Sequence, residues 1–176
     1  EQIFEKLEQF GLRVGRVSPM NADNRLERPA FFIPDPWTNT STDGSALSIW
    51  IHRALRQAVN DNAEEKIQPT TLVYLLLAFL RFSKVKNWPT YIKLFLGRKK
   101  RWNKALFLDL FLADSFAKLT RKHKNDFSTL FLNGFAHIQH HYFLSSKHYD
   151  GSLINPEEYI KKEEDPILDA IKIYDR

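Results

Sequence analysis

Three histidines within five positions form a compact group of side chains that can bind a metal. His137, His140 and His141 follow Asn133, and they make up half of the six histidines in the sequence. His137 lies three residues before His140 and four before His141, spacings that place either pair on one side of a helix. Asn133 lies four residues before His137 and can add an oxygen ligand. These types and spacings indicate a metal or catalytic site.

An apolar run at residues 127–132 leads directly into the histidines. It predicts a fully buried strand over residues 126–134. Open α/β sheets place their sites at the carboxyl ends of such strands, which is where the histidines stand. The alternative is that one or two of them are ordinary polar residues in a loop, because no acidic residue is adjacent and sites for zinc, manganese or iron usually include one.

A second candidate is the loop at residues 33–44, IPDPWTNTSTDG. Asp35 and Asp43 are possible ligands or bases, and Trp37 is placed to stack on a substrate. The alternative is a turn built on an Asp side chain, with the Trp packed into the protein.

A third candidate is the basic run at residues 96–104, with five cationic residues around Trp102. Such a run can bind phosphates, and the alternative is a solvated turn between helices. No motif for binding DNA or RNA supports it, so we expect no nucleic-acid partner. Asp109 and Asp114 are five residues apart, about 140° around a helix, and are expected to be solvated or capping residues.

Composition limits the class of protein. The chain has 176 residues, which favours one domain, and its apolar fraction of 43% is ample for a core. The net charge of +5 suits an anionic substrate. Because there are no cysteines, a metal must be bound by His, Asp, Glu or Asn. No run is long enough to span a bilayer, so we expect a soluble chain with no membrane segment. The compartment does not follow from the sequence, although the cytoplasm is favoured.

Helical periodicity alternates with short apolar runs along the chain. Strands are predicted at 12–17, 30–34 and 126–134, and helices at 3–12, 46–60, 69–85, 88–97, 102–124 and 166–175, with a polar break at 60–69. The helix at 69–85 is apolar nearly all round, so it should be central to a helical cluster. The pattern predicts an α/β fold with a few-stranded, mostly parallel sheet and a helical cap insertion. Residues 1–44 and 126–176 would form the core, and residues 45–125 the cap.

The segment FSTLFLNGFAHIQHHYF, residues 127–143, resembles the alkaline phosphatase superfamily, in the branch of type I phosphodiesterases, nucleotide pyrophosphatases and sulfatase-like hydrolases. Members of that branch carry a strand that ends in Asp-x-x-x-His, and both residues bind a catalytic metal. The matching pattern here is Asn133-x-x-x-His137, with Asn where Asp is usual. A bacterial group with an Asn-Gly-x-Ala-His-x-Gln-His pattern is similar. Weaker similarities to this group cover three other stretches, residues 12–22, 31–37 and 165–175.

The resemblance implies a hydrolase-type α/β core that uses divalent Zn or Mn on a small phosphate or sulfate ester. His137 would be a metal ligand, with Asn133 as a weaker neutral ligand and His140 as a second ligand. His141, Asp35 and Trp37 would contact the substrate. The family's nucleophile, its Asp-His-Gly motif and a further His have no match here, so the catalytic residues are unknown. The chain begins at Glu1 without Met and ends within a helical pattern, so we expect an internal fragment.

One alternative from another class stays open. The chain is basic and rich in helix, which also fits a non-catalytic binding module whose His cluster is structural. Oligomeric state, substrate and metal identity do not follow from the sequence.

Overall fold

The computed structural model describes residues 2–60, 69–97, 100–156 and 164–175. Most of the predicted polar break, two residues of the basic run (98–99) and part of the last loop (157–163) lie outside this range. Within it the chain is mixed α/β with a three-stranded, all-parallel sheet, as the sequence predicts. In chain order the elements are α1 (Ile3–Gln9), β1 (Val14–Val17), β2 (Phe31–Ile33), α2 (Ala46–Asn60), α3 (Pro69–Phe82), η1 (Val85–Asn87), α4 (Trp88–Leu96), α5 (Trp102–His123), β3 (Phe127–Leu130), α6 (Gly134–Tyr142), η2 (Phe143–Ser145) and α7 (Pro166–Tyr174).

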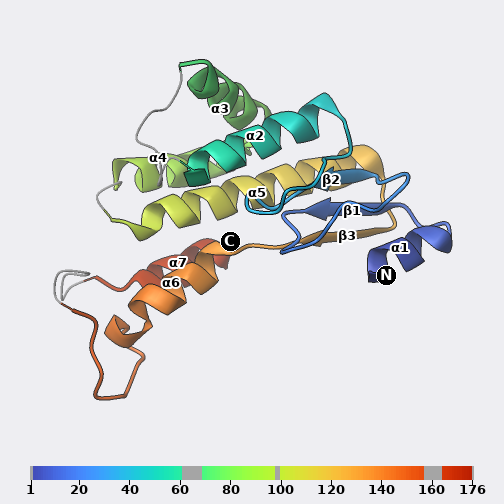
Figure 1. Cartoon of the computed structure of the whole chain (residues 1–176). Helices are drawn as coiled ribbons and strands as arrows, with labels where there is room; N and C mark the ends of the chain where they lie inside the picture. The colour runs from blue at the N-terminus through green and yellow to red at the C-terminus, as the bar shows by residue number, and fades with distance from the viewer. Residues whose placement is uncertain (1, 61–68, 98–99, 157–163, 176) are drawn as a thin grey trace. The chain divides into compact units, whose positions relative to one another are not determined.

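The three predicted strands lie side by side in the order β2-β1-β3 (Figure 1). In the register of the sheet, Gly15 of β1 lies between Phe31 of β2 and Ser128 of β3. A Cβ atom on Gly15 would overlap the ring of Phe31. That ring packs edge-on against Phe116 of α5, with ring centroids 6.2 Å apart. Because Gly15 has no side chain, the ring of Phe31 has room to lie over the central strand and to pack against α5.

The opposite face of the sheet carries a buried cation. Arg16 of β1 is only 4% exposed. Its guanidinium carbon lies 3.4 Å from the ring centroid of Phe4 in α1, and one of its terminal nitrogens donates to Gln2 Oε1 at 3.1 Å. Phe4 also contacts Phe127 of β3, with centroids 6.2 Å apart. The short helix α1 thus packs on the sheet through one aromatic ring.

The prediction that the third strand is fully buried is wrong. Phe127 is exposed, and Ser128, Thr129 and Leu130 are only partly buried. The reason is position, because β3 is an edge strand among the described residues, with β1 as its one neighbouring strand there. An apolar run indicates strand but not whether a neighbour covers it.

The prediction that α3 is central to a helical cluster is also wrong for the side chains the structure describes. Ala78 and Phe82 are buried, while Val73, Leu76, Leu77 and Leu80 are exposed. α3 packs against α2, and the exposed residues recur at intervals of three and four along one face of the helix.

The chain divides into two compact units, which we describe separately. One contains residues 1–84 and 111–131, with the sheet, α1, α2, α3 and the second half of α5. The other contains residues 85–110 and 132–176, with α4, the first half of α5, α6 and α7. The predicted division into a core (1–44 and 126–176) and a cap (45–125) stays a prediction.

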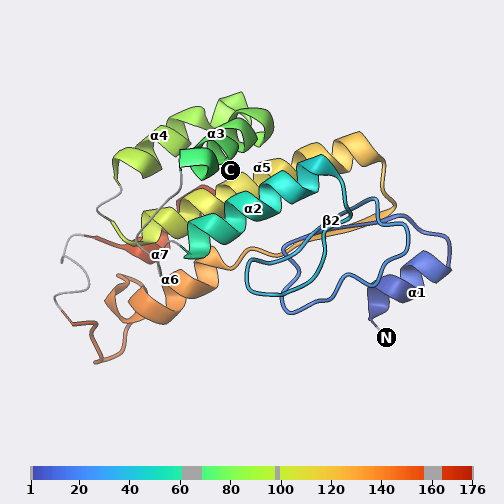
Figure 2. The same cartoon turned by 45° about the horizontal axis from the view of Figure 1, so that its top comes forward.

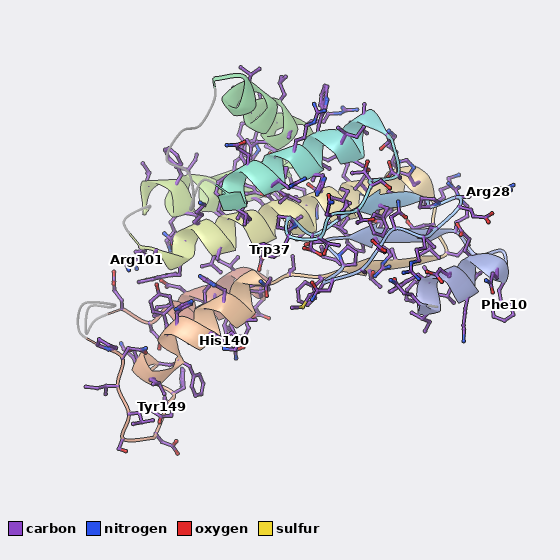
Figure 3. The ribbon with its side chains drawn as sticks, viewed as in Figure 1. Phe10, Arg28, Trp37, Arg101, His140 and Tyr149 are labelled. Carbon is purple, nitrogen blue, oxygen red and sulfur yellow. The ribbon has the colours of Figure 1, made fainter. Side chains whose placement is uncertain are left out.

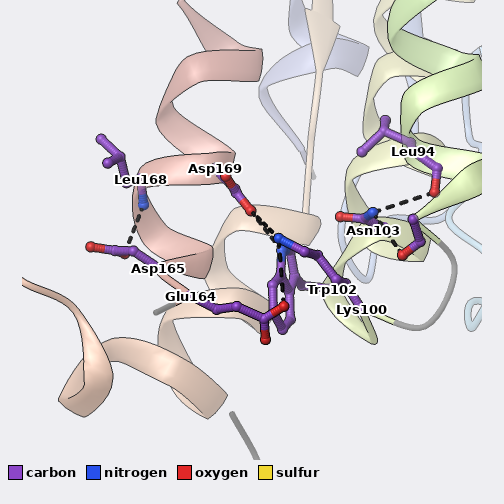
Figure 4. Close-up of polar contacts among 9 residues, drawn as sticks. Leu94, Lys100, Trp102, Asn103, Glu164, Asp165, Leu168 and Asp169 are labelled. Atoms are coloured by element: carbon purple, nitrogen blue, oxygen red, sulfur yellow. Dashed lines mark hydrogen bonds and ion pairs between the residues drawn. The ribbon is translucent and has the colours of Figure 1, made fainter. Parts of the chain in front are cut away.

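The second unit has its own apolar core, in which α6 lies beside α7 (Figures 1 and 2). Its buried members come from four helices: Leu94, Trp102, Leu106, Ile138, Tyr142, Ile167 and Ala170. Polar contacts border this core (Figure 4). Lys100 lies 3.4 Å from Asp169 and 3.6 Å from Glu164, and the indole Nε1 of Trp102 donates to Asp169 at 3.3 Å. α7 begins as predicted, with Asp165 as N-cap and Pro166 in the first turn.

Candidate functional site

The helix that carries the histidines, α6, begins on a buried carboxylate. Asp109 of α5 accepts a hydrogen bond from the backbone N–H of Gly134 at 2.7 Å, and others from the N–H groups of Asn133 and Phe135. The hydroxyl of Tyr174 in α7 donates to the same carboxylate. A helix N-terminus attracts anions, and in α6 this position is occupied by a carboxylate of the chain itself.

Burial raises the pKa of Asp109, and the four hydrogen bonds lower it without cancelling that effect. The fit is close, because a Cβ atom on Gly134 would overlap an oxygen of Asp109. The sequence predicts Asp109 and Asp114 as capping or solvated residues. Both are buried, and both bind backbone N–H groups, since Asp114 accepts from Lys84 at 2.8 Å. The solvated alternative is therefore wrong: Asp109 binds the start of α6, and Asp114 binds the residue just before η1.

His137 and His141 form the closest pair in the histidine cluster. They stand on consecutive turns of α6 and their ring centroids are 4.5 Å apart. Partial desolvation lowers the pKa of His137, and the neighbouring His141 and His140 lower it further. A lowered pKa favours the neutral imidazole near neutral pH, which is the form that binds metal. Two imidazoles this close can be ligands of one first-row cation at N-to-metal distances of about 2.0–2.1 Å.

Asn133 and His140, the other two predicted ligands, are placed differently. Asn133 is the N-cap residue of α6, but its side chain makes no capping hydrogen bond. Its amide oxygen is therefore not used by the helix. His140 is exposed on α6 (Figure 3), as His137 and His141 also are, and it is the ring contacts that differ: they join His141 to His137 and to Tyr142. The structure thus brings together His137 and His141, whereas the assignment of His140 as a ligand stays a prediction.

The donor set at this position is small. Across residues 2–60, 69–97, 100–156 and 164–175, no three His, Asp or Glu side chains converge on one point. His137 and His141 can supply two ligands to a tetrahedral cation, and Asn133 lies one turn earlier on the chain. Such a set leaves positions for a water or a substrate oxygen, which is the arrangement of open metal sites.

Asp35, in the other predicted loop, is buried and fully hydrogen-bonded. Its Oδ1 accepts from the backbone of Trp37 and Thr38, each at 2.9 Å. Its Oδ2 accepts from the Asn21 backbone at 3.1 Å and from the Thr38 hydroxyl at 2.5 Å. This pattern is a turn built on an Asp side chain and favours the structural interpretation. Trp37 is 63% exposed (Figure 3), so it is not packed and can still stack on a ligand.

Asp43 closes the outer edge of β2 and starts α2. Its Oδ2 accepts from the Phe32 backbone at 2.7 Å, and its own N–H donates to the Phe32 carbonyl at 3.1 Å. The same carboxylate accepts from the Ser45 backbone at 2.7 Å and the Ser48 hydroxyl at 2.6 Å. These bonds indicate a structural carboxylate, not a base facing a substrate.

Two polar residues of the sheet unit escape the sequence reasoning. His52 of α2 is bonded to the Asp35 backbone, its Nε2 is buried without a partner among the described residues, and burial lowers its pKa. Ser18 directly follows β1 and has a positive φ of 53°. A lone His on an amphipathic helix and a Ser after a strand give no signal in one sequence, because burial and φ depend on the fold.

Comparisons with known proteins do not assign a family. No family model, no curated protein and no solved structure matches this chain. The resemblance to alkaline-phosphatase-type hydrolases therefore stays a proposal. Along the described residues, no helix is both long and apolar enough to cross a bilayer.

Proposed function

We propose that α6 provides a site for one divalent cation, Zn²⁺ or Mn²⁺, and that the site serves a metal-dependent hydrolase acting on a small phosphate or sulfate ester. The observation that carries the proposal is the 4.5 Å separation of the His137 and His141 rings on a helix that follows a parallel strand. His137 belongs to both histidine pairs that the spacing predicts, and the structure favours the pair with His141.

The surroundings of the pair support this assignment. Asp109 fixes the first turn of α6 through three backbone N–H groups, so the helix that carries both imidazoles is held at its start. The Asn133 amide lies one turn before His137 and adds an oxygen without adding charge. A bound cation would attract an ester oxygen and stabilise negative charge that develops on it. The chain's own contribution would be to position the cation and the anionic substrate.

The metal site is tested by calorimetric titration of the chain with ZnCl₂ and MnCl₂. We expect His137→Ala and His141→Ala each to weaken binding by about tenfold or more, because each removes one of two ligands. His148→Ala is the matched control, since His148 is exposed in the same unit but lies outside α6. His140→Ala separates the two assignments. A loss for His140→Ala equal to that for His137→Ala would restore His140 as a ligand, and equal heats for all variants would refute the site.

The ester-hydrolase part has a separate test. Inorganic phosphate and sulfate are titrated into the chain with and without Zn²⁺. If the cation is the anion-binding centre, anion binding should require the metal and should disappear in His137→Ala. Metal binding without any metal-dependent anion binding would leave the cation site and overturn the hydrolase assignment.

The second candidate, a non-catalytic basic binding module, also has a structural observation in its favour. Asp35, Asp43 and Asp109 are all engaged with backbone N–H groups, so these carboxylates do not act as exposed acids or bases. This candidate predicts that His137→Ala lowers the melting temperature and that no variant changes binding of metal. The titrations above therefore distinguish the two functions.

A further inference from the structure

The outer face of α4 is apolar and exposed. The inner face of this helix packs on α5, where Tyr91 meets Phe107 with ring centroids 4.9 Å apart. On the outer face, Ile92, Phe95 and Leu96 are 57%, 61% and 74% exposed. Val85, in the turn just before the helix, is 73% exposed.

These side chains form one continuous stripe. At about 100° per residue, Trp88, Ile92, Phe95 and Leu96 lie within an arc of about 100° around α4. The buried residues of the helix, Thr90, Tyr91 and Leu94, lie outside that arc. One side of α4 thus packs on the core, and the opposite side exposes an apolar stripe. Exposed apolar patches of this kind mark sites that bind a protein or a membrane.

The charged residues in the chain segment that carries the stripe all have one sign. Lys86 and Lys93 are exposed beside it, and Arg101, just before α5, is exposed as well (Figure 3). The sequence from Lys84 to Leu108 contains no acidic residue. Among the described cations of this stretch, Lys100 is paired with Glu164 and Asp169, and Lys84 with Asp114. The surface that surrounds the stripe is therefore complementary to an anionic partner.

We propose that this face of α4 docks on an anionic lipid bilayer. Exposed aliphatic and aromatic side chains with flanking Lys and Arg are the pattern of helices that lie in the plane of the membrane interface, with their apolar side chains inserted by about 5–10 Å. Trp88 belongs to the stripe, and Trp is enriched at that depth. The lysines and Arg101 would contact anionic headgroups, as juxtamembrane basic residues do.

Other occupants fit the same surface less well. A second copy related by a two-fold axis would bring the same cations face to face. Nucleic acid would meet the charges and could stack on Trp88 and Phe95, but the aliphatic side chains of Val85, Ile92 and Leu96 offer neither hydrogen bonds nor rings to bases. A bilayer with anionic headgroups and an apolar interior uses both features.

The test is flotation of the full chain with phosphatidylcholine vesicles, with and without phosphatidylserine, at low and high salt. We expect flotation with phosphatidylserine vesicles, weaker at high salt because the charges are then screened. Ile92→Asp combined with Leu96→Asp should weaken partitioning by about a hundredfold. Lys93→Glu should weaken it by about tenfold. The control is Leu153→Asp with Ile154→Asp, which adds the same two charges at exposed apolar positions of the same unit and should float like the native chain.

Circular dichroism melts show whether each variant folds, and Lys93→Glu keeps the test decisive if the double variant does not. The proposal is overturned if the native chain does not float, or if the α4 variants float as well as the control. It is equally overturned if the α4 variants abolish self-association in light scattering, or retention on single-stranded RNA, without changing flotation. Those outcomes would assign the stripe to a second copy or to nucleic acid.

Discussion

At the scale of single residues, buried aspartates fix the loops and helix ends of this protein. Asp109, Asp114 and Asp165 each accept from the backbone N–H of a distant segment. An unbonded N–H that is buried costs about 1–3 kcal/mol, so each carboxylate stabilises the segment it contacts. Their burial is therefore explained by a structural role, and no catalytic role is needed for these three aspartates.

We predict that Asp109→Ala lowers the free energy of unfolding by about 2 kcal/mol or more, because it leaves the first N–H groups of α6 and the Tyr174 hydroxyl without their acceptor. Asp109→Asn should cost less, since its amide oxygen still accepts from Gly134 and burial no longer opposes a charge. Urea unfolding followed by circular dichroism measures both. Equal losses for the two variants would mean that the carboxylate charge, and not the acceptor geometry, holds α6.

Asp165 predicts a pH dependence. Burial raises the pKa of this residue, but hydrogen bonds from the Leu168 and Lys147 backbone and the Ser146 hydroxyl, with the nearby His148, outweigh it, so the net pKa is lowered. A carboxyl with a lowered folded pKa stabilises the protein above its unfolded pKa of about 3.9, and this stability is lost as the pH falls through the folded value. The native chain should therefore exceed Asp165→Asn in unfolding free energy at neutral pH, and the gap should shrink as the pH falls below about 3.9.

The measurement is urea unfolding of both proteins at about pH 7 and about pH 3, on either side of the unfolded Asp pKa. A gap that does not change with pH would show that the Asp165 carboxylate is no better bonded in the folded protein than in the unfolded one.

At the scale of elements, Arg16 makes an unusual junction between α1 and the sheet. Burial removes the guanidinium from water and lowers its pKa to about 10. Replacing a buried ion by an apolar side chain of similar size is often neutral or stabilising. We predict that Arg16→Met unfolds within about 1 kcal/mol of the native chain, whereas Arg16→Ala loses about 2–4 kcal/mol because it leaves a cavity under Phe4. If both variants lose the same amount in urea unfolding, the cation over the Phe4 ring contributes more than its burial costs.

Local sequence signals predict the elements well and their surroundings poorly. Pro166 and the capping Asp165 mark the start of α7, and the apolar runs around Val14 and Phe32 mark strands, because these signals act within a few residues. The exposure of β3 and of α3 was not predictable in this way, since it depends on which elements lie beside them. The same limit applies to the site: spacing gives His137 two partners, and only the side-chain conformations on α6 favour His141.

At the scale of the whole molecule, α5 runs through both compact units, and its two buried aspartates lie on either side of the boundary between residues 110 and 111. Asp109 binds the start of α6 in one unit, and Asp114 binds Lys84 in the other. We predict that the units open separately, as cooperative parts of a protein often do. In hydrogen-exchange mass spectrometry, Asp109→Ala should speed exchange in α6 and α7, and Asp114→Ala should speed it around residues 83–87.

Each variant is the control for the other, because both remove a buried carboxylate from the same helix. Uniform acceleration over β1, β2, α6 and α7 in either variant would show that the chain opens as one cooperative body.

The two edge strands of the sheet differ in whether their outward backbone groups are already hydrogen-bonded. At β2, the outward N–H and carbonyl of Phe32 are both occupied by Asp43. At β3, the alternation of a parallel ladder turns the backbone groups of Ser128 and Leu130 outward, and no strand in the described parts of the chain meets them. A fourth strand can therefore join beside β3 and not beside β2. Substitutions in residues 127–131 should therefore affect aggregation. Apolar, β-branched residues there would favour pairing of this edge with the same edge of another molecule, whereas charged residues or Pro would prevent it.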